Sequence, residues 1–428
     1  MMLSRLAKPW RRPDDVPALG RAGRFFILGN SISAFGASLA MPYFAIFLIG
    51  IRGGAASAVG VLTLISVVDL VAQRLVASPL ERSYGGRLPA IAGCWIQAVG
   101  WASLALSTAP WQVFACACAI GLGNALFFSV RVNLQMDIVD EAAHGYSFAL
   151  RYLCGNIGIL LGGVLGGATV SWLGTDDGVT VLLLANSATF ILFALIITSA
   201  VTPSAEQRHS KRHALNDGES KPRDRRWNSA ATGLLVGYFL LVTAGLVQFE
   251  TVLPLQLTAH GGIPAWGIGY LFSASALTTV VLQMPIARLA ARFGGITSVR
   301  IIATTWVLAA LMLWSSAHLS SPGKITLIVI GALLFASGEC LFFPSIPDLL
   351  KTNDPELRRR AGSLTASAHS LGQFVGPSLG IVLVTHSAVG FYLLVAGGAC
   401  IAAVVTRQLR TGSRDEALTA RSKAASQS

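Results

Sequence analysis

The chain has 428 residues, of which 53% are hydrophobic and only 12% are charged. Soluble domains carry roughly 25% charged residues, so this composition excludes an ordinary water-soluble protein. The net charge of +12 would suit a protein that binds nucleic acid, but the placement of the basic residues indicates a different role.

Apolar runs of about twenty residues recur along the chain, which is the pattern of membrane-spanning helices. A hydrophilic segment separates the first six runs from the last six, so we predict an all-α membrane protein with two six-helix bundles. The segments are a basic tail (1–23), an N-terminal bundle (24–202), a linker (203–228), a C-terminal bundle (229–408) and a second tail (409–428). The twelve predicted spans are residues 25–50, 57–80, 90–108, 113–138, 147–172, 179–201, 230–256, 267–287, 297–316, 325–349, 363–386 and 388–406.

The basic residues gather on one side of these spans. They lie in both tails, in the linker and in the loops after spans two, eight and ten, whereas the opposite loops hold only Arg52 and Lys324. Cytoplasmic loops are enriched in Lys and Arg, so both termini are expected in the cytoplasm. We therefore expect an integral protein of a bacterial inner membrane, with lipid rather than nucleic acid around it.

Several short patterns occur twice, in the same order in both halves. Met41-Pro42-Tyr43 in span one matches Leu253-Pro254-Leu255 in span seven, and Leu126-Phe127-Phe128 matches Leu341-Phe342-Phe343. A Gly-Gly pair follows span two at Gly85 and span eight at Gly294. This internal repeat predicts two pseudo-symmetric bundles.

Span five carries a run of glycines inside an otherwise apolar helix. Glycine costs about 1 kcal/mol in a soluble helix, but in lipid small residues let two helix backbones approach closely. The run therefore predicts tight, gating contacts between helices. It comprises Gly158, Gly162, Gly163, Gly166 and Gly167, and its second copy comprises Gly372, Gly376, Pro377 and Gly380.

These features together resemble the major facilitator superfamily. The glycine run looks like the fifth-helix motif of its drug/proton antiporters, with Gly163 where that family usually has proline. The loop SPLERSYGGR is a degraded form of the family pattern G-x-L-a-D-R-x-G-R-R, in which Arg87 keeps the closing basic position. The resemblance implies a twelve-helix secondary transporter that works by alternating access.

Three carboxylates inside the spans are candidates for proton coupling, because an ionisable group in lipid is costly without a task. Glu339 lies near the middle of span ten, Asp69 near the centre of span two and Glu250 toward the outer end of span seven. The alternatives are a structural hydrogen bond between helices for Glu339 and an exposed interfacial position for Glu250.

A further set of residues could line a substrate cavity. Arg131 in span four needs a carboxylate such as Asp69 or Asp137, or an anionic substrate group, whereas Arg151 could reach the cytoplasmic interface. Packing between helices is the alternative for the polar and aromatic members. Besides Arg131, the set comprises Asn30, Gln97, Tyr238, Phe127 and Phe342.

The sequence carries no motif for catalysis or ATP hydrolysis. Gly323-Lys324 lacks the rest of a P-loop, and no HExxH, GxSxG or clustered His/Cys set occurs. We therefore expect no enzyme, metal or cofactor, and a monomer that uses the proton gradient to export amphipathic small molecules. A symporter or facilitator that takes up a small solute is the first alternative, and a non-transporting receptor is the second.

Overall fold

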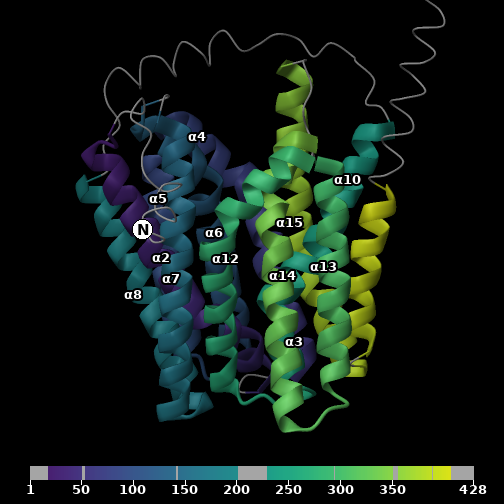
Figure 1. The fold of residues 1–428 in the computed structure, drawn as a ribbon. Coiled ribbons are helices and arrows are strands. Elements are labelled where there is room, and N and C mark those ends of the chain that lie inside the picture. The colour runs from purple at the N-terminus through teal and green to yellow at the C-terminus, as the bar shows by residue number, and fades with distance from the viewer. Residues whose placement is uncertain are drawn as a thin grey trace, which may run out of the picture. The chain divides into compact units, whose positions relative to one another are not determined.

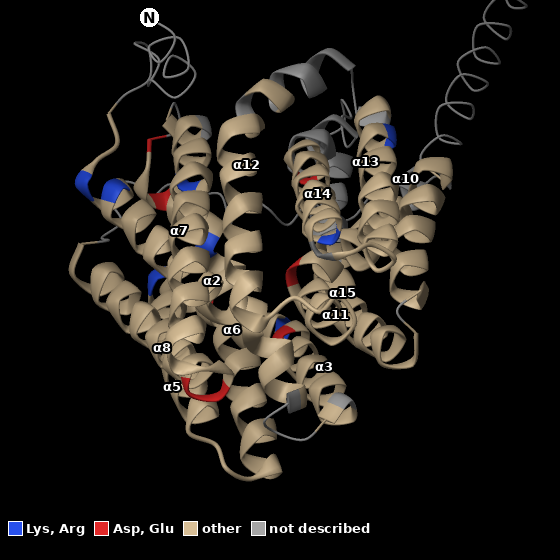
Figure 2. Ribbon diagram, turned by 60° about the horizontal axis from the view of Figure 1, so that its bottom comes forward, with Lys and Arg blue, Asp and Glu red and all other residues tan. Residues whose placement is uncertain are grey.

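The computed structural model describes residues 18–50, 54–140, 143–200, 229–293, 295–349, 355–387 and 389–405, and those residues are almost all helical, without a strand. Ten of the helices are long and apolar enough to cross a membrane (Figure 1). In Figure 2 the helical ribbons are tan over most of their length, with few charged positions. The prediction of an all-α membrane fold is confirmed, whereas the predicted linker and most of both tails lie outside the described residues.

The first six predicted spans each correspond to helical structure. The second span is interrupted near its end by a short π-helical stretch, η2, before the chain turns. The elements are α2 (Arg21–Gly50), α3 (Gly54–Ala72), η2 (Gln73–Ala77), α4 (Ser78–Tyr84), α5 (Arg87–Ala105), α6 (Pro110–Ile138), α7 (His144–Leu173) and α8 (Thr175–Ala200).

The last six predicted spans are helical as well. The seventh span holds two consecutive π-helical stretches, which the hydrophobic pattern does not predict. The elements are α10 (Ser229–Leu241), η4 (Val242–Leu246), η5 (Gln248–Val252), α11 (Leu253–Ala259), α12 (Ala265–Phe293), α13 (Gly295–Ser316), α14 (Ser321–Leu349), α15 (Pro355–His386) and a last helix, Val389–Val405.

The chain divides into two compact units. The first comprises Met1–Arg223 with Ile263–Val280, and the second comprises Asp224–Gly262 with Val281–Ser428. Helix α12 therefore contributes its first part to the first unit, although the sequence places the whole helix in the second half.

Aromatic side chains fill the core of the first unit. Phe193 of α8 lies between Phe26 and Phe127, with ring centroids 5.8 and 5.2 Å away. Phe44 of α2 meets the buried Trp101 of α5 edge to face, at 5.1 Å. Such contacts add specificity to the packing of helices that already share an apolar environment.

Helix α7 uses its glycines on two faces. A Cβ at Gly158 or Gly162 would lie 2.5 Å from a backbone oxygen of α2, and one at Gly163 or Gly167 would lie 2.7 Å from a backbone oxygen of α12. These distances are shorter than real Cβ contacts, so only glycine lets the backbones come this close. Serines add hydrogen bonds of 2.8 Å to α7 carbonyls on both sides, from Ser38 of α2 and Ser273 of α12.

The second glycine copy packs in the corresponding way. A Cβ at Gly376 of α15 would lie 3.0 Å from the Thr243 carbonyl oxygen, and one at Gly372 or Gly380 would collide with side chains of η4 or η5. The stripe Gly158-Gly162-Gly166 thus faces span one, and Gly372-Gly376-Gly380 faces span seven. This structural agreement supports the duplication inferred from the sequence.

Replacing Gly162 with alanine should destabilise the protein, because the new methyl group would press on the Phe35 carbonyl oxygen. We expect a loss of about 1–3 kcal/mol, typical of overpacking. Gly155→Ala is the matched control on the same helix, because its Cβ would meet nothing closer than 3.8 Å. Thermal unfolding of both variants in detergent measures the difference, and equal unfolding temperatures would contradict the close-packing argument.

Candidate functional site

Two of the predicted carboxylates meet in the second unit. Glu339 of α14 and Glu250 of η5 lie close enough to repel each other when both are charged. The Glu339 side chain is half-buried and that of Glu250 is exposed. No ion pair to either carboxylate occurs among the described residues. Binding one proton would remove the repulsion between them.

The backbone around Glu250 is irregular. The π-helical stretches η4 and η5 follow each other in span seven, and Glu250 lies in the second. Pro254 follows in the first turn of α11 and offers no backbone N–H. Single π-helical turns inside helices frequently mark functional sites, and here one of them contains a carboxylate that interacts electrostatically with a second one.

Gln248 supports this irregular backbone. Its side-chain Nε2 donates hydrogen bonds to the carbonyl oxygens of Thr243, at 2.8 Å, and of Gly376 on α15, at 2.7 Å. The side chain is fully buried, so an unsatisfied carbonyl there would be costly. Gln248 therefore connects span seven to the glycine stripe of span eleven through a hydrogen bond. This role was not predicted from the sequence.

The third carboxylate, Asp69, belongs to the first unit. Its Oδ1 accepts a hydrogen bond of 3.1 Å from Nε2 of Gln73, which opens the π-helical stretch η2. A carboxylate beside a π-helical stretch thus occurs in both units. The structure therefore brings Glu339 and Glu250 within electrostatic range of each other in the second unit, and Asp69 belongs to the first unit.

Tyr238 and Phe342 form part of an aromatic cluster in the second unit. Their rings stack at 5.3 Å, and the Tyr238 hydroxyl lies 3.0 Å from Nδ1 of His369 on α15. His369 was not among the candidate residues predicted from the sequence. Its position inside a predicted span was the available signal, because ionisable residues are rare there.

Three other cavity candidates lie in helix contacts of the first unit. Gln97 is fully buried, accepts a 2.8 Å hydrogen bond from the indole of Trp101 and donates to Asn124. Phe127 is buried against Phe193, and Asn30 is buried beside Gly155. All three side chains thus contact residues of neighbouring helices.

Arg131 has aromatic rather than acidic surroundings. Its guanidinium carbon lies 4.9 Å from the centroid of the Phe128 ring, and its Nε has no hydrogen-bond partner. Asp69 is bonded to Gln73 instead. Asp69, which the sequence suggested as a partner for Arg131, thus does not neutralise the charge of Arg131.

The loop between spans two and three is ordered by its motif residues. Gly85 ends α4 with a φ of 76°, a conformation that favours glycine. Arg87 donates to the last carbonyls of α8, including Ile197 at 3.3 Å, where the helix dipole favours a cation. Glu81 accepts from Asn133 of α6 at 2.9 Å. The corresponding Gly294 lies outside the described residues.

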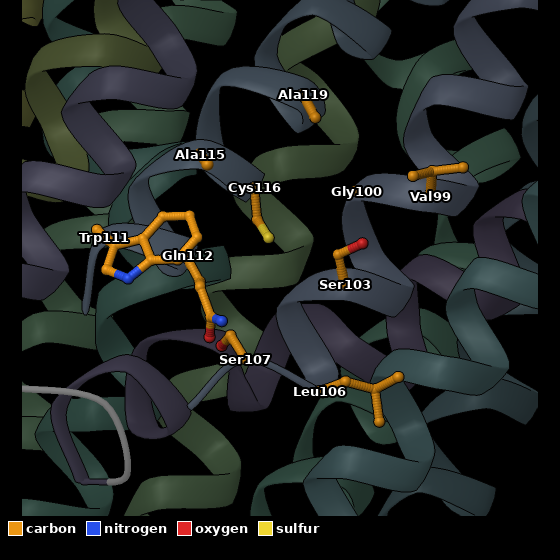
Figure 3. A pocket seen from close by; sticks show the side chains of 10 residues that line it. All are labelled: Val99, Gly100, Ser103, Leu106, Ser107, Trp111, Gln112, Ala115, Cys116 and Ala119. Carbon is orange, nitrogen blue, oxygen red and sulfur yellow. The ribbon is translucent and has the colours of Figure 1, made fainter. Parts of the chain in front are cut away.

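The described part of the first unit contains a cavity and an apolar groove. One, of 460 Å³, lies between the adjoining ends of α5 and α6, and Figure 3 shows small side chains around it together with Trp111 and Gln112. The other, of 490 Å³, is an apolar groove between α2 and α7 with Arg24 and Ser31 on its α2 side. None of the candidate carboxylates lines either cavity.

The family model described as Major Facilitator Superfamily matches residues 26–267 and 252–426. The chain therefore belongs to this superfamily, as its repeated halves and glycine motif predicted. Ten apolar helices agree with an integral membrane protein.

Among curated relatives, multidrug resistance protein MdtH of Cronobacter sakazakii is 27% identical over 274 residues, covering 62% of this chain and 63% of MdtH. The chain thus matches less than two thirds of that relative. The uncharacterized MFS-type transporter YqjV of Bacillus subtilis is 24% identical over 374 residues, covering 83% of this chain and 84% of YqjV.

Solved structures with the same fold include two transporters. The nucleoside transporter NupG has a TM-score of 0.67 at 13% identity, covering 92% of this chain and 99% of that chain. A POT family transporter in complex with 5-aminolevulinic acid has a TM-score of 0.68 at 14% identity, covering 94% and 98%. At these identities the likeness establishes the fold alone.

Replacing Gln248 with leucine should destabilise the second unit, because two carbonyl oxygens would lose their donor. The expected cost is about 1–3 kcal/mol. Gln256→Leu is the matched control, since Gln256 is also buried but makes one long contact of 3.5 Å, to Tyr392. The unfolding temperatures of the two variants are measured in detergent. A larger decrease in Gln256→Leu than in Gln248→Leu would contradict the role assigned to Gln248.

Proposed function

We propose that this protein is a secondary active transporter of a bacterial inner membrane that exports amphipathic small molecules in exchange for protons. The observation that carries this proposal is the pair of carboxylates, Glu339 and Glu250, which lie within electrostatic range of each other in the second unit. Neither has an ion-pair partner in the described part of the chain. A pair of this kind can take up and release a proton without a cofactor.

The proposed coupling is electrostatic. When both carboxyls are ionised, their repulsion disfavours the arrangement that brings them together, and one proton relieves it. Proton binding therefore biases the protein toward one of two conformations, and cargo biases it toward the other. Reciprocal effects on a shared equilibrium are what an exchange cycle requires. The π-helical stretches next to Glu250 give span seven a place to change its hydrogen bonding.

Two further observations favour export over the other functions considered. The glycine motif of α7 resembles that of drug/proton antiporters, and the MdtH relatives are named multidrug resistance proteins. A symporter or facilitator remains the alternative on the same fold, and it would move solute and protons in the same direction. The direction of proton movement therefore separates the two.

Glu339→Gln and Glu250→Gln should each abolish cargo-driven proton movement in proteoliposomes, because a neutral amide neither binds nor releases the coupling proton. A pH-sensitive dye inside the vesicles reports the movement after addition of a cationic amphiphile such as ethidium. Asp177→Asn is the matched control, since Asp177 is an exposed carboxylate in the first turn of α8. Its coupling should equal that of the unchanged protein.

Unchanged coupling in both glutamine variants would remove the carboxylate pair from the mechanism. Proton movement in the same direction as the cargo would identify a symporter instead. A susceptibility panel in an exporter-deficient host, with and without the protein, identifies which compounds it exports.

A further inference from the structure

Two arginines inside the first unit share one local pattern. Phe128 precedes Arg131 on α6 by three residues, and Phe148 precedes Arg151 on α7 by three residues; this F-x-x-R spacing occurs nowhere else in the chain. Residues three apart lie on one helix face. The guanidinium carbons lie 4.9 Å and 5.2 Å from the ring centroids of Phe128 and Phe148, within the range of cation–π attraction.

A buried hydrogen bond fixes the two patterns beside each other. Nε2 of Gln135 on α6 donates to Oγ of Ser147 on α7 at 3.0 Å. Gln135 lies four residues after Arg131, and Ser147 lies four residues before Arg151. Each arginine therefore lies one helical turn, about 6 Å along the helix axis, from the hydrogen-bonded residue of its own helix. It also lies on the same helix face as that residue. The two guanidinium groups are accordingly close enough to repel each other.

The paired guanidinium groups lack a neutralising partner. Nε of Arg131 and Nη1 of Arg151 are shielded from solvent and make no hydrogen bond. Neither arginine forms an ion pair with another residue of the described chain. Two carboxylates of the same unit accept hydrogen bonds from amide side chains, Asp69 from Gln73 and Glu81 from Asn133. One shielded cation is costly, and two that repel each other cost more.

We propose that Arg131 and Arg151 form a binding site for the carboxylate or phosphate group of an aromatic or otherwise amphipathic ligand. Guanidinium groups bind both anions through paired, charge-assisted hydrogen bonds, and an anion would convert their repulsion into attraction. The partly exposed Phe128 ring offers an apolar contact for the rest of the ligand. The statement that this ligand is the transported cargo rests on the proposed function. The anion site itself does not, because it is argued from Arg131 and Arg151 alone.

The test compares three probes of similar size on purified protein in neutral detergent. Phenyl phosphate should bind and raise the unfolding temperature in a saturable way, because a ligand of the folded state stabilises it. Benzyl alcohol and benzyltrimethylammonium, which lack the anion, should produce no such effect through this site. Arg131→Gln and Arg151→Gln should each weaken phenyl phosphate binding at least about tenfold, and Arg131→Lys should weaken it less, because lysine keeps the charge but loses the planar fork.

A second readout separates binding from folding. Without phenyl phosphate, each glutamine variant should unfold at a temperature equal to or above that of the unchanged protein, because one of two repelling charges is gone. Arg82→Gln is the control, since Arg82 is an exposed arginine on α4, and it should leave phenyl phosphate affinity unchanged. Wild-type affinity in both Arg131→Gln and Arg151→Gln would overturn the proposal, as would equal loss in Arg82→Gln.

The source of the anion is resolved in nanodiscs. If phosphatidylglycerol competes with phenyl phosphate in the unchanged protein, the site takes a lipid headgroup; if it does not, the site takes a soluble anion. Either result supports an anion-binding site at Arg131 and Arg151. Glu339→Gln should retain phenyl phosphate binding while losing proton coupling, so failure of the proposed exchange mechanism and failure of the anion site give different results.

Discussion

The close approach of α7 to its neighbours is the constraint on which the first unit depends. Helices in lipid gain no hydrophobic energy from meeting each other, so they associate through packing and hydrogen bonds. Glycines on two faces of α7 let the backbones of α2 and of the first part of α12 come near, and Ser38 and Ser273 bond to its carbonyls. Because both faces are used, α7 has little freedom to accept larger side chains on either side.

The same packing scheme recurs in the second unit with different chemistry. Gly372, Gly376 and Gly380 of α15 face span seven as the first copy faces span one. Span seven departs from regular helix at η4 and η5, where Gln248 satisfies carbonyls on both sides of the contact. Both copies therefore make the close contact, and in the second unit the irregular stretch of span seven also contains Glu250.

Charge is distributed unequally over the two units. The first holds an arginine pair stacked on phenylalanines, and the second holds a carboxylate pair next to π-helical turns. Like charges held together inside an apolar environment are unfavourable unless a proton or a counter-ion joins them. The two pairs are thus suited to two different ligands, a proton in one unit and an anion in the other, on a scaffold of common origin.

The sequence by itself determined the all-α membrane fold and the superfamily, and it singled out three carboxylates inside the spans as candidates. Lipid imposes those features locally: each span must satisfy its own backbone hydrogen bonds and bury few charges, and both requirements appear in residue order. Only the tertiary structure decided which residues and helices contact one another. It paired Glu339 with Glu250, placed Gln97 in a helix contact, added His369 and Gln248, and moved the start of α12 into the first unit. Those outcomes depend on which helix faces contact each other and on π-helical turns, which change the direction of the side chains that follow. Neither can be predicted from hydrophobic periodicity.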